Sequence, residues 1–189
     1  MEMINQKNFK LILNEINECL SRIDNQEIEN IIDTILKSRQ IILVGAGRMG
    51  LILQSFCARL NHMGIPAFMA GAIGCPPLRK EDMLLVASSS GETPTTREIA
   101  LIASKMGSRV FTITANKAST IAKISTGCLY MQSPSSLTYE ESNVLKSSQP
   151  MKTLFEQSLF ILLESIVLYL LEHTGQNADD LAKRHTNLE

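Results

Sequence analysis

The chain has 189 residues, 44% of them hydrophobic and 20% charged, with a net charge of −1 at pH 7. This length and balance predict a single domain with one buried core, and they exclude a strongly basic nucleic-acid-binding protein. The four cysteines lack metal-type spacing, and the N-terminus lacks the basic start and apolar run of a secretion signal. We therefore expect reduced thiols and a cytoplasmic protein.

Hydrophobic periodicity predicts two amphipathic N-terminal helices within 1–38 and an α/β core at 40–131. The apolar runs of the core do not alternate with polar residues, which is typical of parallel strands covered on both faces. Strands and helices that alternate at this spacing indicate an α/β three-layer sandwich. The predicted helices are 3–22, 26–38, 48–63, 93–106 and 116–124, and the predicted strands are 40–45, 66–70, 83–87, 109–114 and 128–131.

Three further segments follow the core. Residues 132–149 are polar and rich in serine, which predicts an exposed loop of functional or mobile character. Residues 150–174 form a long helix with apolar residues on nearly every side, so we expect a second subunit to cover part of it. Charged residues within this helix argue against a membrane span. The polar tail at 176–189 has little apolar surface and can be ordered only by docking.

A glycine-rich motif follows the first predicted strand. Gly45-Ala-Gly-Arg-Met-Gly50 matches the GxGxxG fingerprint of dinucleotide-binding proteins. That fingerprint also requires an acidic residue about 20 positions further on, to hold the ribose hydroxyls. The second strand instead ends in 68–74, a stretch without Asp or Glu. We therefore disfavour NAD and interpret the glycines as a tight turn beneath a smaller ligand.

A second loop carries most of the chemistry. The third predicted strand leads directly into Ser88-Ser-Ser-Gly-Glu-Thr93, called here the hydroxyl loop, and a helix follows at once. Hydroxyls and free backbone N–H groups at a helix start suit a phosphate, although the same residues could merely cap the helix. Because parallel strands place their carboxyl ends at one crevice, both loops should face the same ligand, and Arg48 adds a cation. A small phosphorylated ligand fits this arrangement.

These motifs together resemble the sugar isomerase (SIS) domain, and within it the 6-phospho-3-hexuloisomerases, over essentially the whole chain. The resemblance implies a single SIS domain at 1–189 with a five-stranded parallel sheet of flavodoxin-like topology. It also implies a homotetramer whose tail docks on a neighbouring subunit, and conversion between a 3-hexulose 6-phosphate and fructose 6-phosphate. It rests on Gly45-Ala-Gly-Arg48, Arg59-Leu-Asn-His-Met-Gly64, Ser88-Ser-Ser-Gly-Glu-Thr93, Thr153-Leu-Phe-Glu156 and Arg184-His-Thr-Asn-Leu-Glu189.

The resemblance also implies roles for individual residues. Glu156 would move the carbon-bound proton, and His185 would reach the site of a neighbouring subunit. Moving a carbonyl along a sugar passes through an enediol, which requires a base at carbon and no cofactor. A carboxylate near a helix start could equally serve only the helix dipole. The expected substrate- and phosphate-binding residues are Gly47, Arg48, Ser88, Ser90, Gly91, Glu92 and Thr93.

Other positions leave alternatives open. His62 is either a catalytic residue or a cap for the carbonyls that end its helix, and the histidines lack the spacing of a metal site. Two alternative functions stay open. One is another SIS isomerase, acting on an aldose or heptose phosphate, and the other is a non-catalytic sugar-phosphate-binding module. Four residues depart from the family pattern and leave the identity of the sugar open, namely Met49, Ala72, Cys75 and Lys152.

Overall fold

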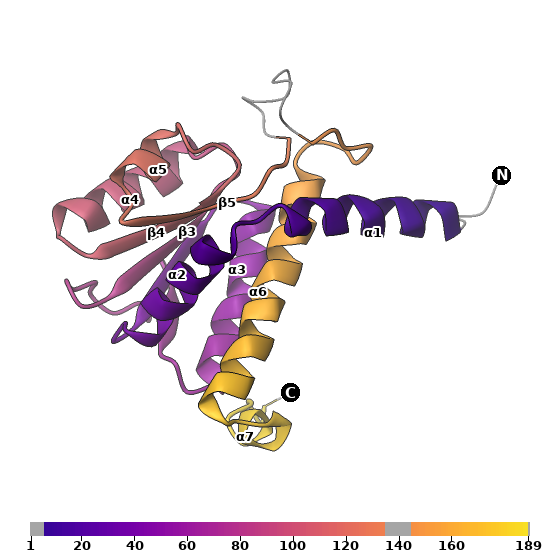
Figure 1. Ribbon diagram of the computed structural model, residues 1–189. Helices are drawn as coiled ribbons and strands as arrows, with labels where there is room; N and C mark the ends of the chain where they lie inside the picture. The colour runs from indigo at the N-terminus through magenta and orange to yellow at the C-terminus, as the bar shows by residue number, and fades with distance from the viewer. Residues whose placement is uncertain (1–5, 135–144, 189) are drawn as a thin grey trace.

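The computed structural model describes residues 6–134 and 145–188 (Figure 1). Its strands form one five-stranded parallel sheet in the order β2-β1-β3-β4-β5, which confirms the predicted α/β fold and its flavodoxin-like strand order. The order reverses between β1 and β3, so these two strands flank the switch point of the sheet. The strands are β1 (Ile41–Gly45), β2 (Ala67–Met69), β3 (Met83–Ala87), β4 (Arg109–Thr114) and β5 (Gly127–Tyr130).

The central strands are apolar on both faces because both faces are covered. Leu43 and Leu85 pair in register and belong to the larger core cluster, on the side of α3 and α6. Their neighbours Val44 and Val86 also pair, but they belong to the smaller cluster on the side of α4. Since side chains alternate along a strand, one apolar run supplies both halves of the core.

Helices form the outer layers of the sandwich (Figure 1). One face of the sheet is covered by α2 (Asn25–Leu36), α3 (Arg48–His62) and α6 (Thr153–Thr174). The other face is covered by α4 (Pro94–Lys105) and α5 (Thr120–Ile124). The remaining helices lie off the sheet: α1 (Gln6–Ser21) packs on α6 and extends sideways, and α7 (Ala178–Ala182) contacts α3.

The long apolar helix is present, as predicted. By length and composition alone α6 could cross a membrane, and it is the one helix among the described residues that meets this test. Half of its apolar stretch is buried, because it packs between α1 and α3 as a core helix does. Exposed apolar side chains remain on it, including Ile161 and Leu168.

Several expectations need adjustment. The predicted helix at 116–124 begins only after Ser119, whose hydroxyl caps α5. The segment 132–149 was expected to be exposed, yet Ser133, Leu145 and Gln149 at its described ends are buried. The reason is that Leu145 belongs to the larger core cluster, while the Gln149 side chain donates to a carboxylate on α1. Residues 135–144 lie outside the described part of the chain.

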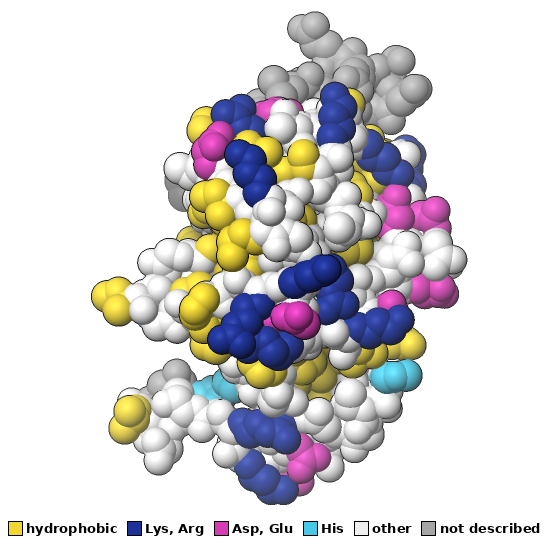
Figure 2. Space-filling model, turned by 90° about the vertical axis from the view of Figure 1, so that its left-hand side faces the viewer, with side chains coloured by type: hydrophobic (Ala, Val, Ile, Leu, Met, Phe, Trp, Pro, Cys, Tyr) yellow, Lys and Arg dark blue, Asp and Glu magenta, His cyan; other side chains and the backbone are white. Residues whose placement is uncertain are grey.

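A polar network closes the amino ends of the strands. The carboxylate of Asp82 is fully buried and accepts hydrogen bonds from Arg39 Nη2 at 2.8 Å, Gln40 Nε2 at 2.9 Å and Arg79 N at 2.6 Å. Arg109 donates to two backbone carbonyls nearby. Lysine and arginine side chains gather across the middle of the face that looks onto this end of the sheet (Figure 2). These contacts give one oxygen of the Asp82 carboxylate three donors, while its other oxygen, Oδ1, is buried without a hydrogen-bond partner among the described residues.

Candidate functional site

Three helices begin around one cavity at the carboxyl ends of β1 and β3. The residues that precede α3, α4 and α6 are Gly47, Thr93 and Lys152, and all three line this cavity. Its volume is about 470 Å³, within the range of small-molecule sites. The position agrees with the rule that ligands of open parallel sheets bind at the switch point.

The starts of these three helices are uncapped. Among the described residues, Gly47 has no side chain that could act as a cap, and neither Thr93 nor Lys152 accepts a hydrogen bond from its helix through its side chain. Helices α2, α5 and α7, which begin elsewhere, are capped by the side chains of Asp24, Ser119 and Asn177. An uncapped helix start leaves backbone N–H groups and the positive end of the helix dipole available to a ligand. The cavity is therefore suited to an anion, above all a phosphate.

Glu156 and Arg48 meet at the wall of this cavity. The Arg48 Nε and Glu156 Oε2 atoms lie 2.5 Å apart, and both residues line the cavity. Glu156 lies in the first turn of α6, where its side chain is 12% exposed, whereas Arg48 begins α3 with a side chain that is 66% exposed. A nearly buried carboxylate with an exposed cationic partner can act as a proton acceptor once a ligand engages the arginine.

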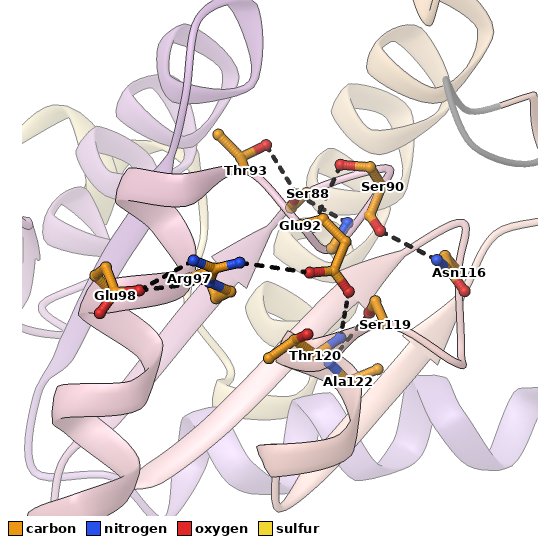
Figure 3. Close-up of polar contacts among 11 residues, drawn as sticks. Ser88, Ser90, Glu92, Thr93, Arg97, Glu98, Asn116, Ser119, Thr120 and Ala122 are labelled. Atoms are coloured by element: carbon orange, nitrogen blue, oxygen red, sulfur yellow. Dashed lines mark hydrogen bonds and ion pairs between the residues drawn. The ribbon is translucent and has the colours of Figure 1, made fainter.

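The hydroxyl loop is held in shape by its own side chains (Figure 3). The Ser88 hydroxyl accepts a hydrogen bond from Gly91 N at 3.1 Å and lies 3.4 Å from the Thr93 hydroxyl. The Ser90 hydroxyl accepts one from Glu92 N at 3.3 Å. Ser88 and Ser90 therefore shape the turn, and of the binding residues expected in this loop only Thr93 lines the cavity.

Gly91 and Glu92 tie the hydroxyl loop to α5. Gly91 has φ of +64°, and a Cβ at this position would lie 2.1 Å from the Ser119 hydroxyl oxygen, so only glycine fits. The Glu92 carboxylate accepts a hydrogen bond from Thr120 N at 2.6 Å and lies 4.0 Å from Arg97 (Figure 3). Both residues position the loop, and neither lines the cavity.

Sequence reasoning missed Ser89. This residue is 1% exposed and lines the cavity, and its hydroxyl has no hydrogen-bond partner among the described residues. A buried hydroxyl without a partner costs stability, so its retention at a cavity wall points to a ligand. The sequence offered no signal that separates Ser89 from its two neighbours, because all three belong to one serine run.

His62 and His185 lie together at the opposite end of α3. Their ring centroids are 4.8 Å apart, and with Arg59 they line a second cavity of about 550 Å³. The tail is held on its own subunit, because the Arg184 guanidinium donates to the His62 carbonyl at 3.0 Å. The rise along α3 separates His62 from Arg48 by about 20 Å, so the histidines do not reach the Glu156 cavity of the same subunit.

The four departures from the family pattern separate into two pairs. Met49 and Lys152 line the Glu156 cavity, while Ala72 and Cys75 do not. Lys152 places a cation four residues before Glu156, on the same side of the first turn of α6. No group of three metal-binding side chains occurs within 6–134 and 145–188.

Comparisons with known proteins show the family to which the chain belongs. The family model of the SIS domain matches residues 34–162. A Bacillus subtilis protein named 3-hexulose-6-phosphate isomerase is 37% identical over 94% of this chain and 95% of its own length. A Mycobacterium gastri protein of the same name is 32% identical over 96% and 90%. A Methanococcus jannaschii crystal structure, from which a 3-hexulose-6-phosphate isomerase function was inferred, matches with a TM-score of 0.83 and 24% identity over 97% and 99%.

Proposed function

The chain belongs to the SIS-domain family, and we propose that it is an isomerase that interconverts a 3-hexulose 6-phosphate and fructose 6-phosphate without a cofactor. The observation that carries the proposal is the cavity in which the Glu156 carboxylate meets three uncapped helix starts. It combines a proton acceptor with an anion site. The activity named for relatives that match nearly the whole chain supports the choice of sugar.

The phosphate binds at the start of α4 in the proposed reaction. The N–H groups of this helix start and the hydroxyls of Ser89 and Thr93 receive the phosphate oxygens. The sugar then extends toward the start of α6, where Arg48 and Glu156 lie. Arg48 exchanges its contact with Glu156 for a substrate oxygen, which leaves the carboxylate to act as the base.

Glu156 then moves one proton between neighbouring carbons. It removes the proton from carbon 2 of the 3-ketose, and the electron pair forms a cis-enediol as the carbonyl oxygen at carbon 3 takes up a proton. Return of the proton to carbon 3, with loss of the hydroxyl proton at carbon 2, gives the 2-ketose. A base of this kind contributes about 10²–10⁴-fold to the rate.

Assembly completes the site in this proposal. The pair formed by His62 and His185 approaches the Glu156 cavity of a neighbouring subunit and moves the hydroxyl protons. Exposed apolar side chains on α1 and α6, including Phe9, Leu13 and Leu168, supply the surface for assembly. The expected state is a tetramer by light scattering, and a monomer with full activity would exclude a shared site.

Deuterium exchange into fructose 6-phosphate, followed by NMR, tests the reaction. Entry at carbon 3 supports the 2,3-enediol and the proposed activity. Entry at carbon 1 indicates an aldose-ketose isomerase instead. Binding detected by a thermal shift without any exchange would favour the non-catalytic module.

A further inference from the structure

Helix α1 is bonded to the segment that leads into the Glu156 cavity. The Glu15 carboxylate accepts hydrogen bonds from Ser147 Oγ at 2.6 Å, Ser148 N at 2.8 Å and Gln149 Nε2 at 3.0 Å. The Ser147 hydroxyl in turn accepts one from Gln149 N at 3.0 Å. One carboxylate thus holds three consecutive residues through bonds that are stronger because the acceptor is charged.

The next residues form the rim of the cavity. Pro150, Met151, Lys152 and Thr153 all line it, and Glu156 follows within the first turn of α6. Thr153 bonds back to the Pro150 carbonyl through both its N–H and its hydroxyl, so the rim and the helix start form one unit. A displacement of residues 147–149 would therefore be passed to the residues that face the ligand.

The rim includes a strained residue. Met151 is the one non-glycine residue with positive φ within 6–134 and 145–188, at +57°, and it is 83% exposed. A left-handed conformation costs a side chain such as methionine about 1–2 kcal/mol. Its own packing cannot hold it there, because most of its surface lies in solvent. Such conformations persist only where the surrounding structure enforces them.

We propose that Glu15 is a positioning residue of the active site, which fixes the rim at 150–153 and thereby the place of Glu156. Glu15 does not line the cavity, so it acts through the segment that it binds. Partial burial alone would raise the pKa of Glu15, but the hydrogen bonds from 147–149 together outweigh it and lower the pKa below its usual value. The carboxylate is therefore charged at neutral pH. The kinetic consequence rests on the proposed isomerase activity.

The test compares two carboxylates one turn apart on the same helix. Glu15→Gln removes the charged acceptor, whereas Glu18→Gln is the matched control, since Glu18 pairs with Arg22, directly after the end of α1, and not with residues 147–149. For Glu15→Gln we expect kcat to fall at least about tenfold, because small displacements of catalytic groups are costly. Glu18→Gln should stay within about twofold of the wild type. Ser147→Ala should give a smaller loss that is not additive with Glu15→Gln.

Hydrogen exchange of the free protein gives a readout that needs no activity. Amides in peptides that cover 150–156 should exchange at least about tenfold faster in Glu15→Gln than in Glu18→Gln. Equal exchange and equal kcat in the two variants would overturn the positioning role. A wild-type protein that isomerises nothing would instead refute the proposed function, while the exchange comparison would still decide the role of Glu15.

Discussion

The amino and carboxyl ends of the sheet differ in how their polar groups are hydrogen-bonded. At the amino ends, Asp82 is buried and its carboxylate accepts three hydrogen bonds. At the carboxyl ends, three helix starts lack side-chain caps and the buried Ser89 hydroxyl has no partner within the described residues. Buried hydrogen bonds such as those of Asp82 stabilise a fold, whereas helix starts without caps beside a cavity leave N–H groups available to a ligand. This difference supports the proposal that the ligand binds at the carboxyl ends of the strands.

The largest effect on turnover should come from Glu156, the proposed base at the carboxyl ends of the strands. We expect Glu156→Gln to lower kcat about 10³-fold while sugar-phosphate binding, followed by calorimetry, changes only a few-fold. Glu164→Gln is the control, because it removes the same charge from α6 away from the cavity. Near-normal turnover of Glu156→Gln would show that another residue is the base.

A substitution at the amino ends of the strands should lower stability and leave turnover unchanged. Asp82→Ala leaves Arg39, Gln40 and Arg79 without their shared acceptor, and we expect the free energy of unfolding to fall by about 2–3 kcal/mol. The kcat of the folded protein should not change. Urea denaturation and steady-state kinetics measure the two quantities. A large loss of kcat with unchanged stability would contradict the assignment of Asp82 to the stability of the fold.

Ser89 and Ser119 allow a hydroxyl at the cavity to be compared with a hydroxyl that caps a helix. Ser89→Ala should weaken phosphate binding by about 1–2 kcal/mol without loss of stability, because its hydroxyl has no hydrogen-bond partner in the part of the chain that the structure describes. Ser119→Ala should lower stability by about 1 kcal/mol, since it removes the cap of α5. Calorimetric titration with inorganic phosphate and thermal melts distinguish these outcomes. If Ser89→Ala binds phosphate normally but melts earlier, its hydroxyl serves the fold instead.

The smallest effect concerns the pH dependence of stability. Because the folded-state pKa of Glu15 is lowered, its contribution is present above the usual value of 4.5 and is lost as the pH falls through the lowered value. The difference in stability between the wild type and Glu15→Gln should therefore shrink in acid below that usual value. Urea titrations of both proteins at several pH values measure it. A constant difference would mean that the charge of Glu15 contributes nothing.

Much of the fold was predictable from local pattern. The unalternating run at 83–87 predicted a strand covered on both faces, and Leu85 and Val86 indeed belong to opposite core clusters. The glycine motif and the hydroxyl loop predicted the ligand-facing edge, because parallel strands place their ends together. Helix ends were less predictable, as α5 shows, since a cap depends on one side chain and its rotamer.

The sequence by itself determined the fold class, the family and the two loops that meet at the switch point, because each depends on periodicity or motif within a few residues. Only the tertiary structure decided that Arg48 pairs with Glu156, and that the Ser89 hydroxyl, unlike those of Ser88 and Ser90, has no hydrogen-bond partner within 6–134 and 145–188. It also brought Glu15 to the rim of the cavity. These facts depend on contacts between segments that are distant in the sequence. Which donor pairs with which acceptor is determined only when those segments are packed together.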